Sequence, residues 1–199
     1  MLKELLQNKK VILASASPRR EQLISGLDID FVVELNGDVD EIWDQSIDPV
    51  KVPEYLSLLK SKGFGRELRS DEILITADTM VLCNGEILGK PADRDDAVKI
   101  LMKLSGNKHT VITGVTLRSN EKVKNFSATT QVWFRDLNIQ EIEYYIDNYK
   151  PYDKAGAYGA QDWIGFVAIE KIEGSYFNVM GLPVQKLYTE LSRFIEENL

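Results

Sequence analysis

Residues Glu72 to Cys83 form a long, β-rich apolar run, and a shorter run, Glu86 to Leu88, follows directly after Asn84-Gly85. Asn-Gly between two such runs is the strongest two-residue hairpin signal, because both residues accept the positive φ angles that the turn requires. The pattern therefore predicts an antiparallel pair of strands in the middle of the chain.

The remaining pattern mixes strands and helices throughout. Apolar runs predict strands over 11–14, 31–34, 110–117, 122–134 and 166–172, and helical spacing predicts helices over 21–26, 52–68, 93–105, 137–149 and 184–197. The second helix would bury Tyr55, Leu58 and Leu59, and the third would bury Ala97, Ile100, Leu101 and Leu104. The two consecutive strands between Thr110 and Phe134 argue against a purely parallel, doubly wound sheet. We therefore expect one α/β unit with a mixed sheet.

Composition narrows the class of protein. The 199 residues are 44% hydrophobic and 28% charged, which suits one compact domain or two closely packed lobes. A net charge of -7 argues against sequence-independent binding to nucleic acid, which requires many Lys and Arg contacts to phosphates. The single cysteine, Cys83, excludes an intramolecular disulfide and a Cys-rich zinc site. Because no signal peptide or membrane-spanning apolar run is found, we expect a soluble, cytoplasmic protein without a membrane partner.

The loop from Ser15 to Arg20 joins a predicted strand to a predicted helix, with Ser17 as N-cap and Pro18 at the first helical position. Free backbone N–H groups and the positive end of a helix dipole suit a phosphate there, and Arg19 and Arg20 add planar, bidentate donors. The alternative is an ordinary helix cap with two solvated arginines. No Walker loop occurs in the chain.

Asp78 interrupts an otherwise apolar strand and is followed by Thr79. An ionised carboxylate in a buried strand is costly unless it is paired, holds a metal or sits at an exposed site. We therefore interpret Asp78 as a functional residue, and the alternative is a structural aspartate that caps a neighbouring turn.

Two further charged features are candidates for the same site. Lys90, held in a turn by Pro91, could contact a phosphate, although a lone lysine in such a turn is usually solvated. Asp38, Asp40 and Glu41 could contribute oxygen ligands to a magnesium site, although acidic runs are also usually solvated.

Two glycine-rich loops, at 154–161 and 173–183, combine small and amide residues. Glycine allows close backbone approach, and Gln161 offers both a donor and an acceptor to a base edge; the alternative is tight turns with a capping role. His109 is the only histidine, so no Ser-His-Asp or Cys-His system is credible, and a structural role is expected for it.

Together these segments closely resemble the Maf family of nucleotide pyrophosphatases, over nearly the whole chain from about Val11 to Leu191. The motifs occur in the family's order: Ser15 to Arg20, Ala77-Asp78-Thr79, Gly89-Lys90-Pro91, Leu104-Ser105-Gly106 with His109 and Thr113, Lys154 to Tyr158, Gly174-Ser175-Tyr176 and Gly181-Leu182-Pro183. The chain resembles the dTTP/UTP pyrophosphatase branch.

The resemblance implies one Maf-like domain over 1–199, with an elongated mixed sheet of the inosine triphosphatase type, two lobes around a cleft and often a homodimer. It implies hydrolysis of dTTP, UTP and modified pyrimidine nucleotides to the monophosphate and pyrophosphate, with a divalent metal such as Mg²⁺ or Mn²⁺. The roles it implies are Asp78 as proton acceptor, Glu41 and Asp78 as metal ligands, Arg19, Thr79 and Gln161 in substrate choice, and Ser15, Arg20, Lys62 and Lys90 around the phosphates.

The chain departs from the family pattern at three places. Gly37 to Glu41 replaces a Ser-Glu-Val-Glu-Glu type stretch, Gly63 replaces the alanine beside the family lysine, and Ala160 replaces an isoleucine before Gln161. The last change could loosen the base pocket. A 7-methyl-GTP pyrophosphatase and a nucleotide-binding regulator of cell division without turnover remain the alternative readings.

Overall fold

The computed structural model describes residues 1–35 and 39–196, and in that part of the chain seven strands form one sheet. The strands are β1 (Lys10–Leu13), β2 (Phe31–Val33), β3 (Glu72–Cys83), β4 (Glu86–Leu88), β5 (Lys108–Arg118), β6 (Val123–Phe134) and β7 (Ile169–Glu173). Their order is β2-β1-β3-β5-β6-β7, with β4 beside β3. The pairs β1–β2 and β1–β3 are parallel, whereas β3–β4 and β6–β7 are antiparallel. The predicted mixed sheet and the hairpin at Asn84-Gly85 are confirmed.

The chain divides into two compact units. Unit 1 comprises Met1–Asp78, Thr113–Ala128 and Gly181–Leu199, and unit 2 comprises Thr79–Ile112 and Thr129–Met180. The predicted single domain over 1–199 stays a prediction. No helix of the described residues has the length and apolar character needed to cross a membrane. Asp38 and Glu197, which belong to the predicted acidic run and the predicted last helix, lie outside the described residues.

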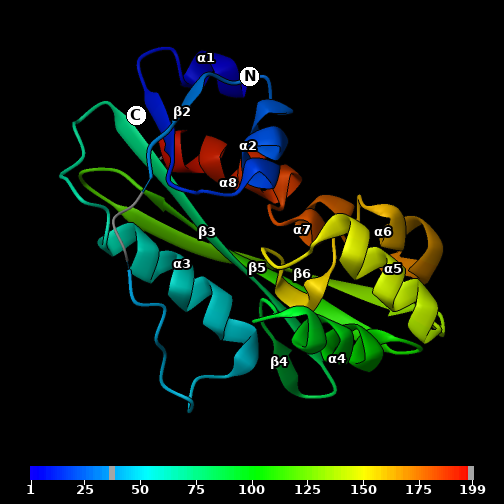
Figure 1. Ribbon diagram of the computed structural model, residues 1–199. Coiled ribbons are helices and arrows are strands. Elements are labelled where there is room, and N and C mark those ends of the chain that lie inside the picture. Colours follow the sequence, from blue (N-terminus) through cyan, green and yellow to red (C-terminus); the bar gives the residue numbers. More distant parts are fainter. Residues whose placement is uncertain (36–38, 197–199) are drawn as a thin grey trace. The chain divides into compact units, whose positions relative to one another are not determined.

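Unit 1 has helices on both faces of its strands, with α3 (Val52–Lys62) on one side and α8 (Val184–Glu196) on the other (Figure 1). Its other helices are α1 (Leu2–Leu5), α2 (Pro18–Ser25) and the 3-10 turn η1 (Pro49–Lys51). The short α1 packs against α8, and the Tyr188 hydroxyl accepts a hydrogen bond from Leu2 N at 3.3 Å. The alternating N-terminal sequence gave no signal for α1, because four residues are too few to show a helical period.

The packing of α3 corrects the predicted stripe. Tyr55 is exposed and Leu58 and Leu59 are only partly buried, so the predicted stripe was wrong. The buried face instead carries residues that let the helix approach β5 closely: Val52, Pro53, Leu56, Ser57 and Ser61.

Two contacts show how close that approach is. A Cβ atom on Gly114 would lie 2.2–2.3 Å from the backbone of Pro53 and Glu54, and Ser57 Oγ lies 2.9 Å from Thr116 Oγ1. Glycine and small hydroxyl residues therefore form this interface. The helix ends at Lys62, before Gly63, rather than at residue 68.

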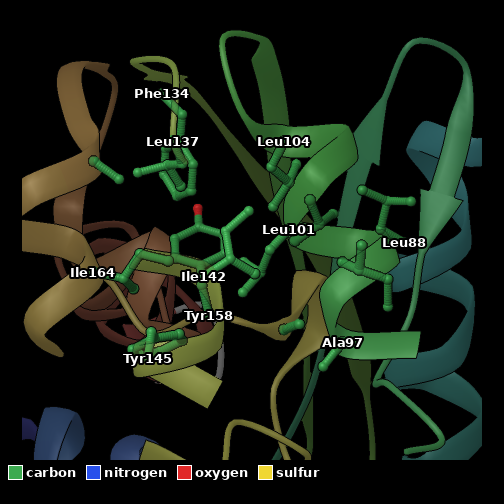
Figure 2. Packing of buried hydrophobic residues seen from close by; sticks show 14 of the residues in the cluster. Leu88, Ala97, Leu101, Leu104, Phe134, Leu137, Ile142, Tyr145, Tyr158 and Ile164 are labelled. Atoms are coloured by element: carbon green, nitrogen blue, oxygen red, sulfur yellow. The ribbon is translucent and has the colours of Figure 1, made fainter. Parts of the chain in front are cut away.

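Unit 2 is built around an apolar cluster of buried residues (Figure 2). Its helices are α4 (Arg94–Leu104), α5 (Ile139–Tyr149), the 3-10 turn η2 (Ala155–Ala157), α6 (Trp163–Ala168) and α7 (Tyr176–Met180). The predicted buried face of α4 is confirmed, and α4 lies beside α5.

The predicted strand over 166–172 is only partly correct, because residues up to Ala168 belong to α6 and β7 begins at Ile169. A short apolar run cannot distinguish a strand from a helical turn. Gly165 lies against Ala160, where an added Cβ would be 1.9 Å from the carbonyl oxygen, and Phe166 is 83% exposed. The chain therefore turns through a helix at a point where the pattern suggested an extended strand.

Candidate active site

The loop between β1 and α2 is held by the hydroxyl of Ser15. Ser15 Oγ accepts a hydrogen bond from Ser17 N at 3.2 Å, and Ser17 O accepts from the backbone N–H groups of Arg20 and Glu21. Ser17 occupies the N-cap position as predicted, but its side chain makes no capping hydrogen bond. The first turn of α2 is therefore not capped by the Ser17 side chain, which leaves donor capacity at the place where a phosphate was predicted.

Arg20 links three of the motifs within unit 1. Its Nε donates to Gly181 O at 2.9 Å, and its Nη1 donates to Ala77 O at 2.8 Å and to Ser15 Oγ at 3.4 Å. Burial lowers the pKa of Arg20, the nearby charge of Asp78 raises it, and the neighbouring charge of Arg19 lowers it. The guanidinium of Arg20 therefore holds the 15–20 loop against Ala77, the residue before Asp78.

Asp78 is 7% exposed and forms an ion pair inside unit 1. Lys60 Nζ, from α3, lies 2.6 Å from Asp78 Oδ1 and 3.1 Å from Glu41 Oε1. An opposite charge at this distance offsets part of the cost of burying a carboxylate. The structure thus brings Glu41 and Asp78, both predicted metal ligands, to one shared cationic partner.

Lys60 was missed by the sequence analysis, which named Lys62. Lys60 follows the buried residues Leu56 and Ser57 by four and three positions, so it continues the face of α3 that packs inward. Lys62 was named from the family resemblance, which does not depend on the register of α3. The observed buried face of α3 is the signal that distinguishes Lys60 from Lys62.

Lys62 itself is exposed and lies about 200° around the helix from Lys60. It lines a surface cavity of about 520 Å³ in unit 1, together with residues that include Phe64, Arg118 and Lys122. Its predicted contact with substrate phosphates stays a prediction.

The donor set around Lys60 is of a kind that a divalent metal accepts. Carboxylate oxygens are hard ligands, and Mg²⁺ commonly uses one or two of them together with water and substrate phosphates. Glu41 and Asp78 supply two such groups, and no cluster of three or more His, Cys, Asp and Glu side chains occurs in the described residues. These residues therefore fit a metal that is completed by phosphate oxygens and water, rather than one enclosed by protein alone.

In unit 2, two predicted motifs lie next to each other. Gly156 N donates to Gly89 O at 3.0 Å, which places the 154–161 loop against the turn that carries the exposed Lys90. Gly156 has φ +71°, and an added Cβ would lie 2.9 Å from the side chain of Val81, so only glycine fits here without strain. Thr79, partly buried, directly follows Asp78 in β3.

The side-chain oxygen of Gln161, Oε1, is buried and accepts no hydrogen bond from the described residues, while the neighbouring Ala160 is 5% exposed. Buried side-chain oxygens are normally hydrogen-bonded, so this atom has unused acceptor capacity. That chemistry suits the base-reading role predicted for Gln161.

His109 has the expected structural role. It is buried in unit 2, its Nε2 lies 2.8 Å from the Tyr158 hydroxyl, and its ring packs edge-on against Phe134. Burial lowers the pKa of His109 to about 4, so the ring is neutral at physiological pH. It holds the loop residue Tyr158 in the core.

Comparison with known proteins agrees with these motifs. A family model described as "Maf-like protein" matches residues 10–194. A "dTTP/UTP pyrophosphatase" of Parabacteroides distasonis is 50% identical over 96% of this chain and 99% of its own length. The protein of the same name from Porphyromonas gingivalis is 47% identical over 97% and 98%. A solved nucleoside-triphosphatase, described as a dITP/XTP pyrophosphatase, from Mycobacterium abscessus aligns with a TM-score of 0.43 at 10% identity, covering 96% of this chain and 98% of that one.

Proposed function

This chain belongs to the Maf family, and from that premise we propose that it hydrolyses dTTP and UTP to the nucleoside monophosphate and pyrophosphate. Modified pyrimidine triphosphates fall in the same class of substrate. The observation that carries the proposal is the buried carboxylate of Asp78, paired with Lys60 and adjacent to the carbonyl that holds Arg20.

Phosphoryl transfer requires alignment and neutralisation of charge more than covalent help from the protein. Ser15, Arg19 and Arg20 bind the triphosphate at the start of α2, and Lys90 adds a further cation. Asp78 orients a water molecule and accepts its proton as the bond between the α- and β-phosphates breaks. Most of the effect comes from the positioning of this water against the α-phosphate.

Two lysines of α3, Lys60 and Lys62, are candidates for the cation that acts at the site. Lys60 is supported by its distances to Asp78 and Glu41, and Lys62 is supported by the family resemblance. We assign Lys60 to the reacting centre and retain Lys62 as a predicted phosphate contact.

Glu41 and Asp78 would hold the divalent metal, Mg²⁺ or Mn²⁺. When bound, such a cation neutralises phosphate charge and lowers the pKa of coordinated water. Asp78 and Glu41 supply the negative charge for which Lys60 and the metal compete.

Gln161 reads the base, and Thr79 and Arg19 contribute to substrate choice. A neutral amide donates to a pyrimidine carbonyl and accepts from the ring N–H of thymine or uracil, and a site built on such paired bonds rejects bases that leave them unmade. The unpartnered Oε1 of Gln161 supports this role.

We also infer one functional domain over residues 1–199, a cytoplasmic location and a homodimer. The acidic net charge of -7 further argues against a nucleic-acid partner.

Purified protein incubated with Mg²⁺ and a panel of triphosphates tests the proposal through the release of pyrophosphate. We expect kcat/KM to be highest for dTTP and UTP, and Gln161→Glu to lose that preference. Preference for 7-methyl-GTP would replace the substrate assignment. Nucleotide binding without pyrophosphate release would support the regulatory alternative.

A further inference from the structure

Tyr145 of α5 is fully buried and belongs to the apolar cluster of unit 2, in which Figure 2 labels it. Its hydroxyl makes two hydrogen bonds to the loop that carries Gln161. The hydroxyl oxygen accepts from Gly159 N at 3.0 Å, and the hydroxyl donates to Asp162 Oδ2 at 2.8 Å. These partners lie on either side of Ala160 and Gln161. One side chain therefore fixes both ends of the segment predicted to contact the base.

Asp162 has a second stabilising neighbour. Lys154 Nζ lies 3.9 Å from Asp162 Oδ2 and 2.8 Å from Asp153 Oδ1. Burial raises the pKa of the Tyr145 hydroxyl, and the hydrogen bond with Asp162 raises it further, so the hydroxyl keeps its proton. The Tyr145 hydroxyl is therefore the donor to Asp162 and the acceptor from Gly159 N.

Close packing leaves the segment little other freedom. A Cβ atom on Gly159 would lie 2.5 Å from Asp162 Oδ2, and one on Gly165 would lie 1.9 Å from Ala160 O. Within this packed turn, the carbonyl oxygen of the Gln161 side chain is buried without a protein partner. The backbone on both sides of Gln161 sets the direction of this side chain. That direction matters, because a hydrogen bond to a base tolerates a displacement of only a few tenths of an ångström.

We propose that Tyr145 and Asp162 are positioning residues that set base selectivity by holding the backbone on both sides of Gln161. The inference rests on the proposed function, since it assumes that Gln161 reads a pyrimidine base. Neither residue belongs to the groups assigned to phosphate or metal binding, which lie in unit 1 except for Lys90. Their loss should therefore alter how well bases are distinguished and leave phosphate binding unchanged.

Tyr145→Phe removes the hydroxyl and keeps the ring, and Tyr149→Phe is the matched control. Tyr149 is also on α5, stacks on Tyr145 with ring centroids 5.2 Å apart, and is exposed. The measurement is the ratio of kcat/KM for dTTP to that for dCTP, because cytosine reverses the donor and acceptor pattern that Gln161 would meet. We expect the ratio to fall about threefold to tenfold in Tyr145→Phe, the effect of one net hydrogen bond, mainly through KM for dTTP.

Inhibition by pyrophosphate, a ligand without a base, is the control for a general structural defect, because such a defect would also weaken the binding of pyrophosphate. Its inhibition constant should stay the same in Tyr145→Phe and in Tyr149→Phe. Asp162→Asn retains an oxygen that accepts from Tyr145, so it should preserve the dTTP:dCTP ratio, whereas Asp162→Ala should lower it. The Asp162 pair carries the test if Tyr145→Phe fails to fold.

The outcomes separate this inference from the proposed function. Wild-type protein that releases no pyrophosphate from dTTP contradicts the function itself. Active wild-type protein whose dTTP:dCTP ratio is unchanged in both Tyr145→Phe and Asp162→Ala overturns the positioning role. Equal losses for both nucleotides together with weaker inhibition by pyrophosphate overturn it as well.

Discussion

The ammonium group of Lys60 lies 2.6 Å from Asp78 Oδ1 and contacts the Glu41 carboxylate at 3.1 Å. One lysine therefore bridges the two acidic residues assigned to the reacting centre. Lys60 and Asp78 are largely buried, whereas the Glu41 side chain is 48% exposed. Removal of Lys60 would therefore cost most at Asp78, where the loss of a buried ion-pair partner is much larger than the loss of a surface ion pair.

Lys60→Met should lower kcat/KM for dTTP by about 100-fold, because a charge that stabilises the reacting phosphates and orients Asp78 is lost. Lys62→Met is the matched control, since the two lysines lie on opposite sides of the same helix, and it should lose less than about tenfold. Steady-state kinetics on both variants provide the comparison. The reverse order of effects would restore Lys62 as the principal lysine of the site.

Arg20→Lys should reduce both activity and stability although the charge is retained. A lysine cannot reach Ala77 O and Gly181 O simultaneously, as the guanidinium does through Nη1 and Nε. The loss of one or two partly buried hydrogen bonds predicts a decrease of about 1–3 kcal/mol in the free energy of unfolding. Urea denaturation and dTTP kinetics test this, and unchanged values in both would exclude the bridging role.

His109 should make stability depend on pH between about 6.5 and 4. Its folded-state pKa of about 4 lies below the ordinary value of 6.5, so the unfolded chain takes up this proton first as pH falls. The contribution of neutral His109 is complete above pH 6.5 and is lost towards pH 4, by up to about 3 kcal/mol.

His109→Gln, which can still bond the Tyr158 hydroxyl, should show a flatter profile over that interval in urea denaturation at several pH values. Glu72 provides an internal contrast. Hydrogen bonding to Arg66 lowers its pKa to about 2, so its contribution is complete above pH 4.5 and is lost only as pH falls towards 2. Identical profiles for wild type and His109→Gln would contradict the assignment.

Local signals predicted much of this fold. The hairpin at Asn84-Gly85 and the buried face of α4 depend on turn chemistry and on a clean helical period, and both are present in the structure. The register of α3 could not be read in the same way. Its inner face carries Ser57, which contacts Thr116, and Pro53, which lies against Gly114, and both partners are more than fifty positions away in the chain.

The same limit applies to the candidate site. Asp78 is conspicuous because a charge interrupts an apolar run, whereas Lys60 is distinguished from Lys62 only by how α3 packs. Tyr145 resembles any aromatic residue on the apolar face of a helix. Its hydrogen bonds to Gly159 and Asp162 depend on how the following loop folds back, which no sequence period encodes.

The most direct test of the account is the rate of pyrophosphate release from dTTP by wild type and Asp78→Asn, measured alongside nucleotide affinity by calorimetry. Asparagine keeps the shape of the side chain and an oxygen that can accept from Lys60, but it cannot take a proton from water. We predict at least a 100-fold loss of kcat, about 2.7 kcal/mol in transition-state stabilisation, with Kd changed by less than about fivefold. A variant that keeps more than about a tenth of wild-type turnover, a loss below ~1.4 kcal/mol, would contradict the role of Asp78 as the catalytic base.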